Sequence, residues 1–248
     1  MIQNVSHSSI TITVVYDNLS YDSTLTSGWG FGWVIQTGKD TILFDTGGNG
    51  KVLLDNMQKL NIDAHSIQSV VISHNHLDHQ GGLKDFLAVN SQGSVFIPSS
   101  SPVGLEHDIH SKGAKAVRVD SFRQIANSIY SSGELKGNIP EQSLMVQAPK
   151  GLLIITGCAH PGIVRIIEHV KPLFPYEPIY LAMGGFHLKG ESSQTISKIV
   201  NTIQEYGVQK IAPSHCTGEA AIQIFKNRFG EDFIESGVGK KIIVERGA

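Results

Sequence analysis

Residues 69–79 read Ser69-Val70-Val71-Ile72-Ser73-His74-Asn75-His76-Leu77-Asp78-His79, an apolar run followed at once by four potential metal ligands. The apolar part is short and rich in β-branched residues, which predicts a buried strand whose carboxyl end opens into a loop. In an extended segment His74 and His76 point to the same side, so they can share one ion. Asp78 and His79 follow where the chain turns, and their side chains can reach a second ion.

Imidazole and carboxylate ligands at this density suit zinc, with iron or manganese as alternatives. A solvated histidine-rich loop would explain one stray histidine, but it explains poorly four ligands at this spacing followed by Gly81-Gly82. We therefore expect a centre of two divalent metal ions, zinc in the first instance.

Composition limits the kind of protein. The chain has 248 residues, of which 40% are hydrophobic and 17% charged, so we expect one globular domain over 1–248. A net charge of -2 without a block of lysine or arginine argues against a nucleic-acid partner. The first six residues are neither basic nor strongly apolar and no later run approaches a membrane span, which predicts a cytoplasmic protein without a membrane partner. Two cysteines do not suggest a disulfide framework, and nothing in the sequence indicates an oligomeric state.

Apolar periodicity predicts the order of secondary structure. Strands are expected at 9–16, 32–36, 41–44, 69–72, 94–97, 143–146, 152–155, 178–182 and 210–213. Helices are expected at 51–60, from about 82 onward, and at 162–170, 192–206 and 218–229. Between about 102 and 140 we expect loops, an extended piece at 116–119 and a hairpin. Two halves of this kind predict an α/β fold, a four-layer αββα sandwich of two sheets with helices outside.

The second half contains three further histidines at the carboxyl ends of predicted strands. His160 follows the strand at 152–155, His187 follows 178–182, and His215 follows 210–213. A centre for two ions needs ligands of this kind, because the short segment 74–79 cannot enclose both ions alone.

The intact HxHxDH signature of His74, His76, Asp78 and His79 resembles that of the metallo-β-lactamase superfamily. The resemblance implies the same αββα fold and a dinuclear centre. In that centre His160 would complete the first ion's ligands with His74 and His76, and His215 would be the last ligand of the second ion.

Asp45, in Phe44-Asp45-Thr46-Gly47-Gly48, matches the first motif of the superfamily and would orient the metal loop. A carboxylate bonded to the second ring nitrogen of a ligand fixes the tautomer of that histidine. The alternative is an ordinary turn aspartate before glycines.

The chain departs from the superfamily pattern at the bridging carboxylate. Cys158 stands where a strand-end aspartate would be expected, and it is a possible ligand because a thiolate can bind zinc. It could equally be a small buried residue that packs the turn. We expect His187 to contact the substrate or transfer a proton, with a role unrelated to the site as the alternative, and we expect Cys216 to be structural.

Three motifs in the second half are more specific: Thr156-Gly157-Cys158-Ala159-His160-Pro161-Gly162-Ile163, Gly184-Gly185-Phe186-His187-Leu188 and Ser214-His215-Cys216-Thr217-Gly218. They resemble a subfamily of metal-dependent hydrolases similar to 7,8-dihydropterin-6-yl-methyl-4-(β-D-ribofuranosyl)aminobenzene 5′-phosphate synthase. That subfamily usually has a His-Gly-Leu-Ser type segment where this chain has Ser27-Gly28-Trp29-Gly30-Phe31-Gly32. We expect this loop to border the substrate pocket.

These observations predict a metal-dependent hydrolase of a small-molecule ester, lactone or phosphoester. Coordination lowers the pKa of water to about 7, so a bridging hydroxide would attack, steered by Asp78 as a ligand of the second ion. One alternative is a dihydropterin-linked synthase that transfers a pterin-methyl group to an aryl amine ribofuranosyl phosphate. Another is a non-catalytic metal-bound sensor or scaffold. A redox di-iron role fits less well, because such superfamily members typically carry glutamate where this chain has His76.

Overall fold

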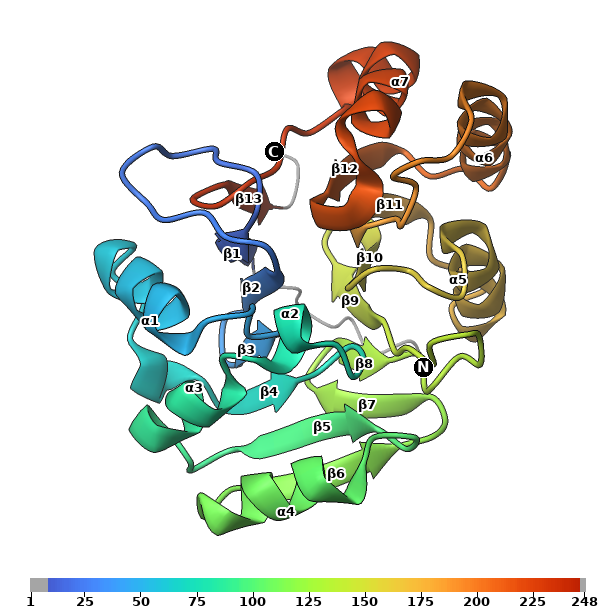
Figure 1. Ribbon diagram of the computed structural model, residues 1–248. Helices are drawn as coiled ribbons and strands as arrows, with labels where there is room; N and C mark the ends of the chain where they lie inside the picture. The colour runs from blue at the N-terminus through green and yellow to red at the C-terminus, as the bar shows by residue number, and fades with distance from the viewer. Residues whose placement is uncertain (1–8, 246–248) are drawn as a thin grey trace.

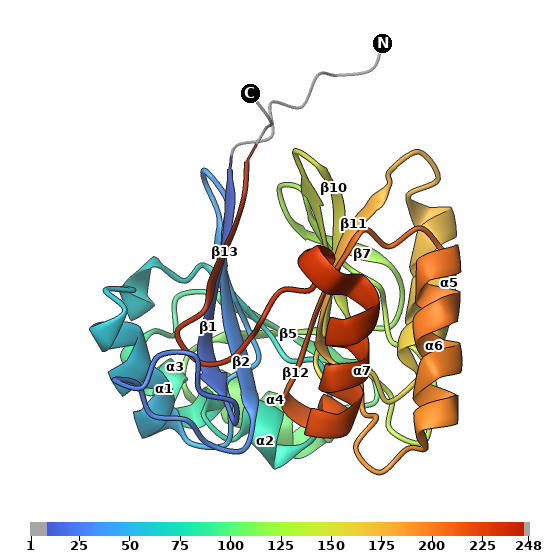
Figure 2. The same ribbon diagram turned by 90° about the horizontal axis from the view of Figure 1, so that it is seen from above.

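Two β-sheets lie face to face, and helices cover the outer face of each sheet (Figures 1 and 2). The computed structural model describes residues 9–245; the N-terminal segment 1–8, on which part of the localisation prediction rests, and residues 246–248 lie outside the described part. The strand orders are β13-β1-β2-β3-β4-β5-β6 and β12-β11-β10-β9-β8-β7. The predicted four-layer αββα sandwich is therefore confirmed.

The elements have the following bounds. The first sheet contains β1 (Ile10–Asp17), β2 (Phe31–Gln36), β3 (Thr41–Phe44), β4 (Ser69–Val71), β5 (Ser94–Pro98), β6 (Lys115–Val119) and β13 (Lys241–Val244). The second contains β7 (Arg123–Ala126), β8 (Ile129–Ser131), β9 (Leu144–Ala148), β10 (Gly151–Thr156), β11 (Ile179–Gly185) and β12 (Lys210–Ser214). The helices are α1 (Gly50–Lys59), α2 (Leu77–Gln80), α3 (Leu83–Val89), α4 (Val103–Ser111), α5 (Ile163–Val170), α6 (Ser193–Glu205) and α7 (Glu219–Phe229).

Side-chain alternation along the strands produces the layers. In β2, Phe31, Trp33 and Ile35 belong to the apolar cluster between the two sheets, whereas Val34 belongs to the cluster under α1 and α3. Such a period of two is what a strand buried on both faces requires. On the other outer face, α5 buries Ile163, Ile166, Ile167 and Val170, the i, i+3, i+4, i+7 spacing of one helix face.

Parallel pairing brings several strand ends to one edge. β3, β4, β5 and β6 run parallel in the first sheet, and β10, β11 and β12 run parallel in the second. Loops that leave the carboxyl ends of these strands therefore gather at one edge of the sandwich, where the predicted ligands lie.

The structure contains three strands or α-helices that the sequence-based prediction lacks: the single-turn α2, α4 and β13. We expect only loops and a hairpin across 102–140, and this is wrong at its start, because Val103–Ser111 forms α4. Its apolar pattern is weak, since Val103 is 77% exposed and only Ile109 is fully buried. The extended piece and the hairpin are present as β6 and as the pair β7 and β8. Apolar periodicity also does not predict β13, which pairs with β1 at the edge of the first sheet.

Within residues 9–245, no helix combines the length and the apolar character that crossing a bilayer requires.

Neighbouring isoleucines in β13 provide a matched test of the inter-sheet core. Ile242 is 6% exposed and packs between the sheets, whereas Ile243 is 58% exposed. Ile242→Ala should lower the free energy of unfolding by about 3 kcal/mol, because it removes buried methyl groups and leaves a cavity. Ile243→Ala should lower the free energy of unfolding by less than about 1 kcal/mol. Urea denaturation measures both, and equal losses would contradict the placement of β13.

Candidate metal centre

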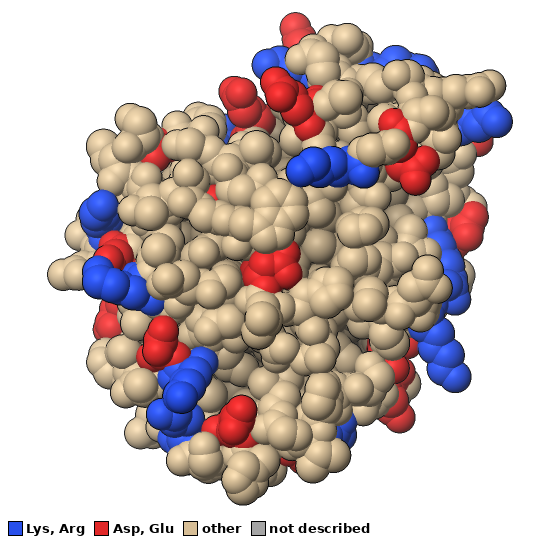
Figure 3. Space-filling model, in the orientation of Figure 1, with Lys and Arg blue, Asp and Glu red and all other residues tan. Residues whose placement is uncertain are grey.

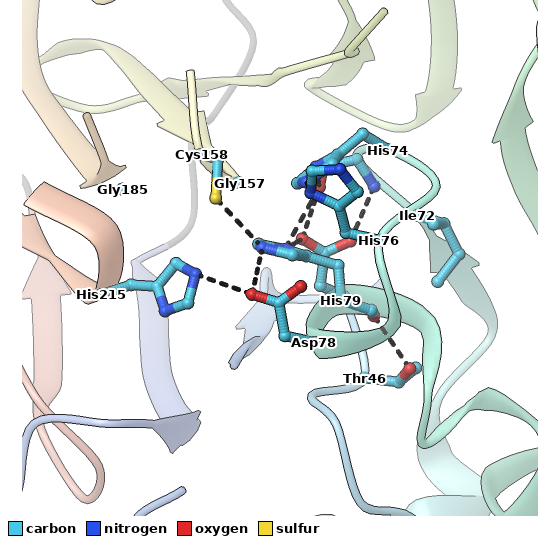
Figure 4. Close-up of polar contacts among 12 residues, drawn as sticks. Thr46, Ile72, His74, His76, Asp78, His79, Gly157, Cys158, Gly185 and His215 are labelled. Carbon is cyan, nitrogen blue, oxygen red and sulfur yellow. Dashed lines mark hydrogen bonds and ion pairs between the residues drawn. The ribbon is translucent and has the colours of Figure 1, made fainter. Parts of the chain in front are cut away.

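The predicted ligands converge from both sheets (Figure 4). The loop after β4 and the first turn of α2 carry His74, His76, Asp78 and His79. His160 lies in the turn after β10, and His215 begins the short 3-10 turn after β12.

The first group of ligands consists of His74, His76 and His160, whose ligand atoms all lie within 4.8 Å of one another. Nε2 of His74 is 3.1 Å from Nδ1 of His76. The ring of His160 lies 4.7 Å from that of His74 and 5.0 Å from that of His76.

The second group consists of Asp78, His79 and His215, again within 4.8 Å. Oδ2 of Asp78 lies 3.3 Å from Nε2 of His215 and 3.6 Å from Nε2 of His79. Burial alone would raise the pKa of Asp78, but the two histidines outweigh burial and lower it. Asp78 is therefore ionised at neutral pH, as a ligand of a cation would need to be.

Asp45 fixes the orientation of the metal loop. It is fully buried at the end of β3, and its carboxylate accepts hydrogen bonds from the Ser73 amide at 2.7 Å and the Ser73 hydroxyl at 2.6 Å. It also accepts one from Nδ1 of His79 at 2.7 Å. Because the Ser73 hydroxyl donates to Asp45, its oxygen accepts from Nδ1 of His74 at 2.9 Å. Both histidines are thus held in the tautomer that leaves Nε2 as a free ligand atom.

Glu141 performs a similar task from the second sheet, and sequence reasoning missed it. Its fully buried carboxylate accepts hydrogen bonds from the backbone N–H groups of Gly157, Cys158, Ala159 and His160 at 2.9–3.1 Å. Burial raises the pKa of Glu141 to about 7, although these N–H groups act against the shift. The carboxylate therefore shapes the turn that presents His160.

Asn18 is a second residue that the motifs did not identify. Nδ1 of His215 donates to Oδ1 of Asn18 at 2.7 Å, which leaves Nε2 of His215 directed at Asp78. Its neighbour Asp17 is fully buried, and burial raises the pKa of that carboxyl to about 6. A short polar segment after β1 thus orients a ligand from the far end of the chain.

The chemistry of these donors fits a metal ion. Nε2 of His160 and Nε2 of His215 are buried and have no hydrogen-bond partner among the described residues. Burial and the neighbouring imidazoles lower the pKa of His74, and burial with His187 lowers that of His160 to about 4. Neutral imidazoles whose lone pairs face a shared point are what a divalent cation requires, and leaving them unmatched would be costly. His74, His76 and His160 would hold one ion, and Asp78, His79 and His215 the other.

Comparisons with known proteins agree with this geometry. Residues 30–107, which include the HxHxDH segment, match the sequence model of the metallo-β-lactamase superfamily. A crystal structure of a metal-dependent hydrolase of the β-lactamase superfamily superimposes with a TM-score of 0.79 and 29% identity over 94% of this chain and 98% of that one. Residues 30–107 therefore match this superfamily, and the chain as a whole is similar in sequence and structure to one of its metal-dependent hydrolases.

Two further comparisons are informative. The 7,8-dihydropterin-6-methyl-4-(β-D-ribofuranosyl)-aminobenzene-5′-phosphate synthase of Methanocaldococcus jannaschii is 28% identical, over 93% of this chain and 95% of its own length. The short form of human tRNase Z shares 14% identity and a TM-score of 0.64, covering 95% of this chain and 99% of that one, which shows the fold alone. The resemblance to the synthase-like subfamily is thus confirmed at the level of sequence.

Cys158 lies where it could serve both ions of a metallo-β-lactamase centre. Its Sγ is 3.2 Å from Nε2 of His79, and it forms a candidate ligand group with His74 and His79, one from each set of ligands. Gly185, at the end of β11, has no room for a side chain, because a Cβ there would lie 2.7 Å from Sγ of Cys216 and would clash with the Gly157 carbonyl. Cys158 as a ligand remains a prediction, and its burial also suits a packing role.

His187 lies at the rim of the centre. Its ring is exposed and lies 4.3 Å from the ring of His160, and it forms a group with Cys158 and Cys216. Hydrogen bonding to Cys216 raises the pKa of His187. The predicted contact between His187 and substrate stays a prediction.

Several residues of the centre adopt a strained backbone. Asp45, Ala159, His187 and His215 have φ between 51° and 59°, the left-handed region that non-glycine residues rarely occupy. Such strain persists where the surrounding structure enforces it, and it concentrates at functional sites.

Removing the Glu141 carboxylate should disrupt the first group of ligands. Glu141→Ala leaves buried N–H groups without an acceptor, so we expect a loss of about 3 kcal/mol in unfolding free energy, together with a weaker metal site at His160. Glu141→Gln retains an acceptor oxygen, so its unfolding free energy should fall by less. Thermal denaturation and metal titration measure the two effects, with Glu191→Ala on the exposed surface as the control. Equal behaviour of Glu141→Ala and Glu191→Ala would contradict the role of this carboxylate.

Proposed function

We propose that this protein is a metal-dependent hydrolase that uses two divalent metal ions to cleave a small-molecule ester, lactone or phosphoester. The observation that carries the proposal is the convergence of two candidate ligand groups, in which the buried Nε2 atoms of His160 and His215 make no hydrogen bond within the described part of the chain. The superfamily assignment and the similarity to a metal-dependent hydrolase support it.

Two bound cations would polarise the oxygen under attack and increase the acidity of water, which is the chemistry that such a centre supplies. The protein's own residues orient the reactants. Both short contacts of Asp78 use Oδ2, so Oδ1 is available to accept a hydrogen bond from the attacking water. Since the pKa of Asp78 is lowered, this acceptor persists at neutral pH.

His187 can donate a proton to the leaving group. It is exposed beside His160, and its pKa is raised by the hydrogen bond to Cys216, so a larger fraction of its imidazole carries a proton near neutral pH. A positioned acid of this kind assists most when the leaving oxygen is strongly basic.

The second candidate function is transfer of a pterin-methyl group to an aryl amine. It is favoured by the 28% identity to the Methanocaldococcus jannaschii synthase along nearly the whole of both chains. The same centre would serve this reaction, in which the amine nitrogen bonds to the pterin methylene carbon, the carbon–oxygen bond to the diphosphate breaks, and diphosphate leaves. Incubation with a dihydropterin diphosphate and an aryl amine ribofuranosyl phosphate, followed by mass spectrometry of the products, separates coupling from hydrolysis.

Metal content tests the paired centre directly. We expect about two equivalents per chain, reduced to about one in Asp78→Asn, with turnover of 4-nitrophenyl esters and phosphodiesters lowered at least about a hundredfold. Asp108→Asn, an exposed change on α4, is the control. Elemental analysis measures the metal content, and initial rates measure turnover. Two tightly bound ions in Asp78→Asn would refute the ligand assignment, and a fully loaded protein without turnover on any substrate would favour the sensor or scaffold.

The role of His187 predicts a dependence on the leaving group. His187→Gln should slow hydrolysis of ethyl esters about a hundredfold, because ethoxide needs a proton in order to leave. The same variant should affect 4-nitrophenyl esters by less than about threefold, since nitrophenolate leaves as an anion. Parallel kcat measurements on both ester series test this, and a uniform loss across the series would indicate a structural role instead.

A further inference from the structure

An exposed tryptophan stands beside the second group of ligands. Trp29 lies in the loop between β1 and β2 and is 52% exposed, although large aromatic side chains are usually more buried. Its ring centroid is 5.0 Å from that of His215, with the planes inclined at 48°. The ring therefore forms part of the wall next to a candidate metal ligand.

A lysine without an acidic partner accompanies this tryptophan. Nζ of Lys189, two residues beyond His187, lies 5.3 Å from the centroid of the Trp29 ring, within the range of a cation–π interaction. Among residues 9–245, no carboxylate lies within 4.0 Å of this ammonium group. The positive charge is thus placed at the rim of the centre and remains available to an anion.

The backbone fixes both residues relative to the metal loop. Gly30 has φ of +145°, and a Cβ there would lie 2.5 Å from the Asp78 carbonyl oxygen, so the loop of Trp29 packs directly on the segment that carries Asp78. The Lys189 N–H donates to the carbonyl of Cys216, the residue after His215. The backbone at both residues is thus anchored to segments that carry candidate metal ligands.

Few basic side chains lie near the middle of the surrounding face. On the face shown in Figure 3, most lysine, arginine and acidic side chains lie toward the periphery, and one acidic group is exposed near the centre. A bulky polyanion would find little positive surface here, whereas one anionic group could be met by one lysine.

We infer that Trp29 and Lys189 form a binding subsite for a planar aromatic ring that carries an anionic group such as a phosphate or carboxylate. The ring would stack on Trp29, and the anion would pair with Lys189. The inference rests on the proposed function, because it places the scissile bond of the substrate over the two ligand groups. Aliphatic substrates of equal charge would lose the stacking contact and bind more weakly.

Three non-hydrolysable probes test the subsite in the metal-loaded protein. They are 4-nitrobenzylphosphonate, which has both ring and anion, 4-nitrobenzyl alcohol, which lacks the anion, and ethylphosphonate, which lacks the ring. Calorimetry should show the tightest binding for the first probe. The chain has two tryptophans, and Trp33 is fully buried, so quenching of tryptophan fluorescence by the nitro-aromatic ring should report chiefly on Trp29.

Substitutions then separate the two contacts. Trp29→Leu should raise the Kd of both aromatic probes about tenfold and leave ethylphosphonate unchanged, whereas Trp29→Phe should retain most of the affinity. Lys189→Gln should raise the Kd of the aryl phosphonate about tenfold and that of the alcohol by less than about twofold. Lys226→Gln, which removes another exposed lysine placed over an aromatic ring, Phe233, is the matched control and should change nothing.

The proposal is overturned if wild-type protein binds ethylphosphonate as tightly as the aryl phosphonate, if it binds none of the probes, or if Lys189→Gln and Lys226→Gln behave alike. Failure of the proposed function would be seen separately, as probe binding that depends on Trp29 and Lys189 in a protein that shows no metal-dependent turnover.

Discussion

The buried carboxylate of Asp45 is the interaction on which the metal centre depends. A carboxylate with no exposure to solvent is tolerated only when donors surround it, and here two of its three donors come from Ser73 and the third from His79. Satisfying this charge therefore determines the path of the loop after β4 and the orientation of two imidazoles together. The cost of leaving this carboxylate without donors thus favours one orientation of His79 and, through the Ser73 hydroxyl, of His74.

Glu141 extends the same constraint to the second sheet. It organises the turn 157–160, and the adjacent Gln142 donates to the Ile72 carbonyl and through its backbone to that of Ser73. Residues 141–142 thus hydrogen-bond to the backbone at 72–73, just before His74, and to the turn 157–160 that carries His160. The relative placement of His74 and His160 follows from this segment as much as from the packing of the sheets.

Much of this arrangement could be predicted from the sequence because local patterns carry it. The apolar strand before His74 and the strand-end positions of His160 and His215 are visible in the linear order of residues, and so is the αββα order of elements. Glu141 was missed because nothing around it resembles a motif, and its four partners lie 16–19 residues away. α4 was missed for a related reason, since little of its surface is apolar and its stability comes from packing on β6. Contacts that form only in the folded chain leave no periodic pattern in the sequence.

The position of β13 has a consequence for how the protein is made. The edge of the first sheet beside β1 is completed by residues 241–244, with Ile10 opposite Val244. On the ribosome, the backbone groups along that edge of β1 remain unpaired until residues 241–244 have emerged. An open strand edge attracts other strands. Nascent chains of this protein are therefore vulnerable to intermolecular pairing from the emergence of β1 until that of β13, and a chaperone that shields β1 would protect them over this interval.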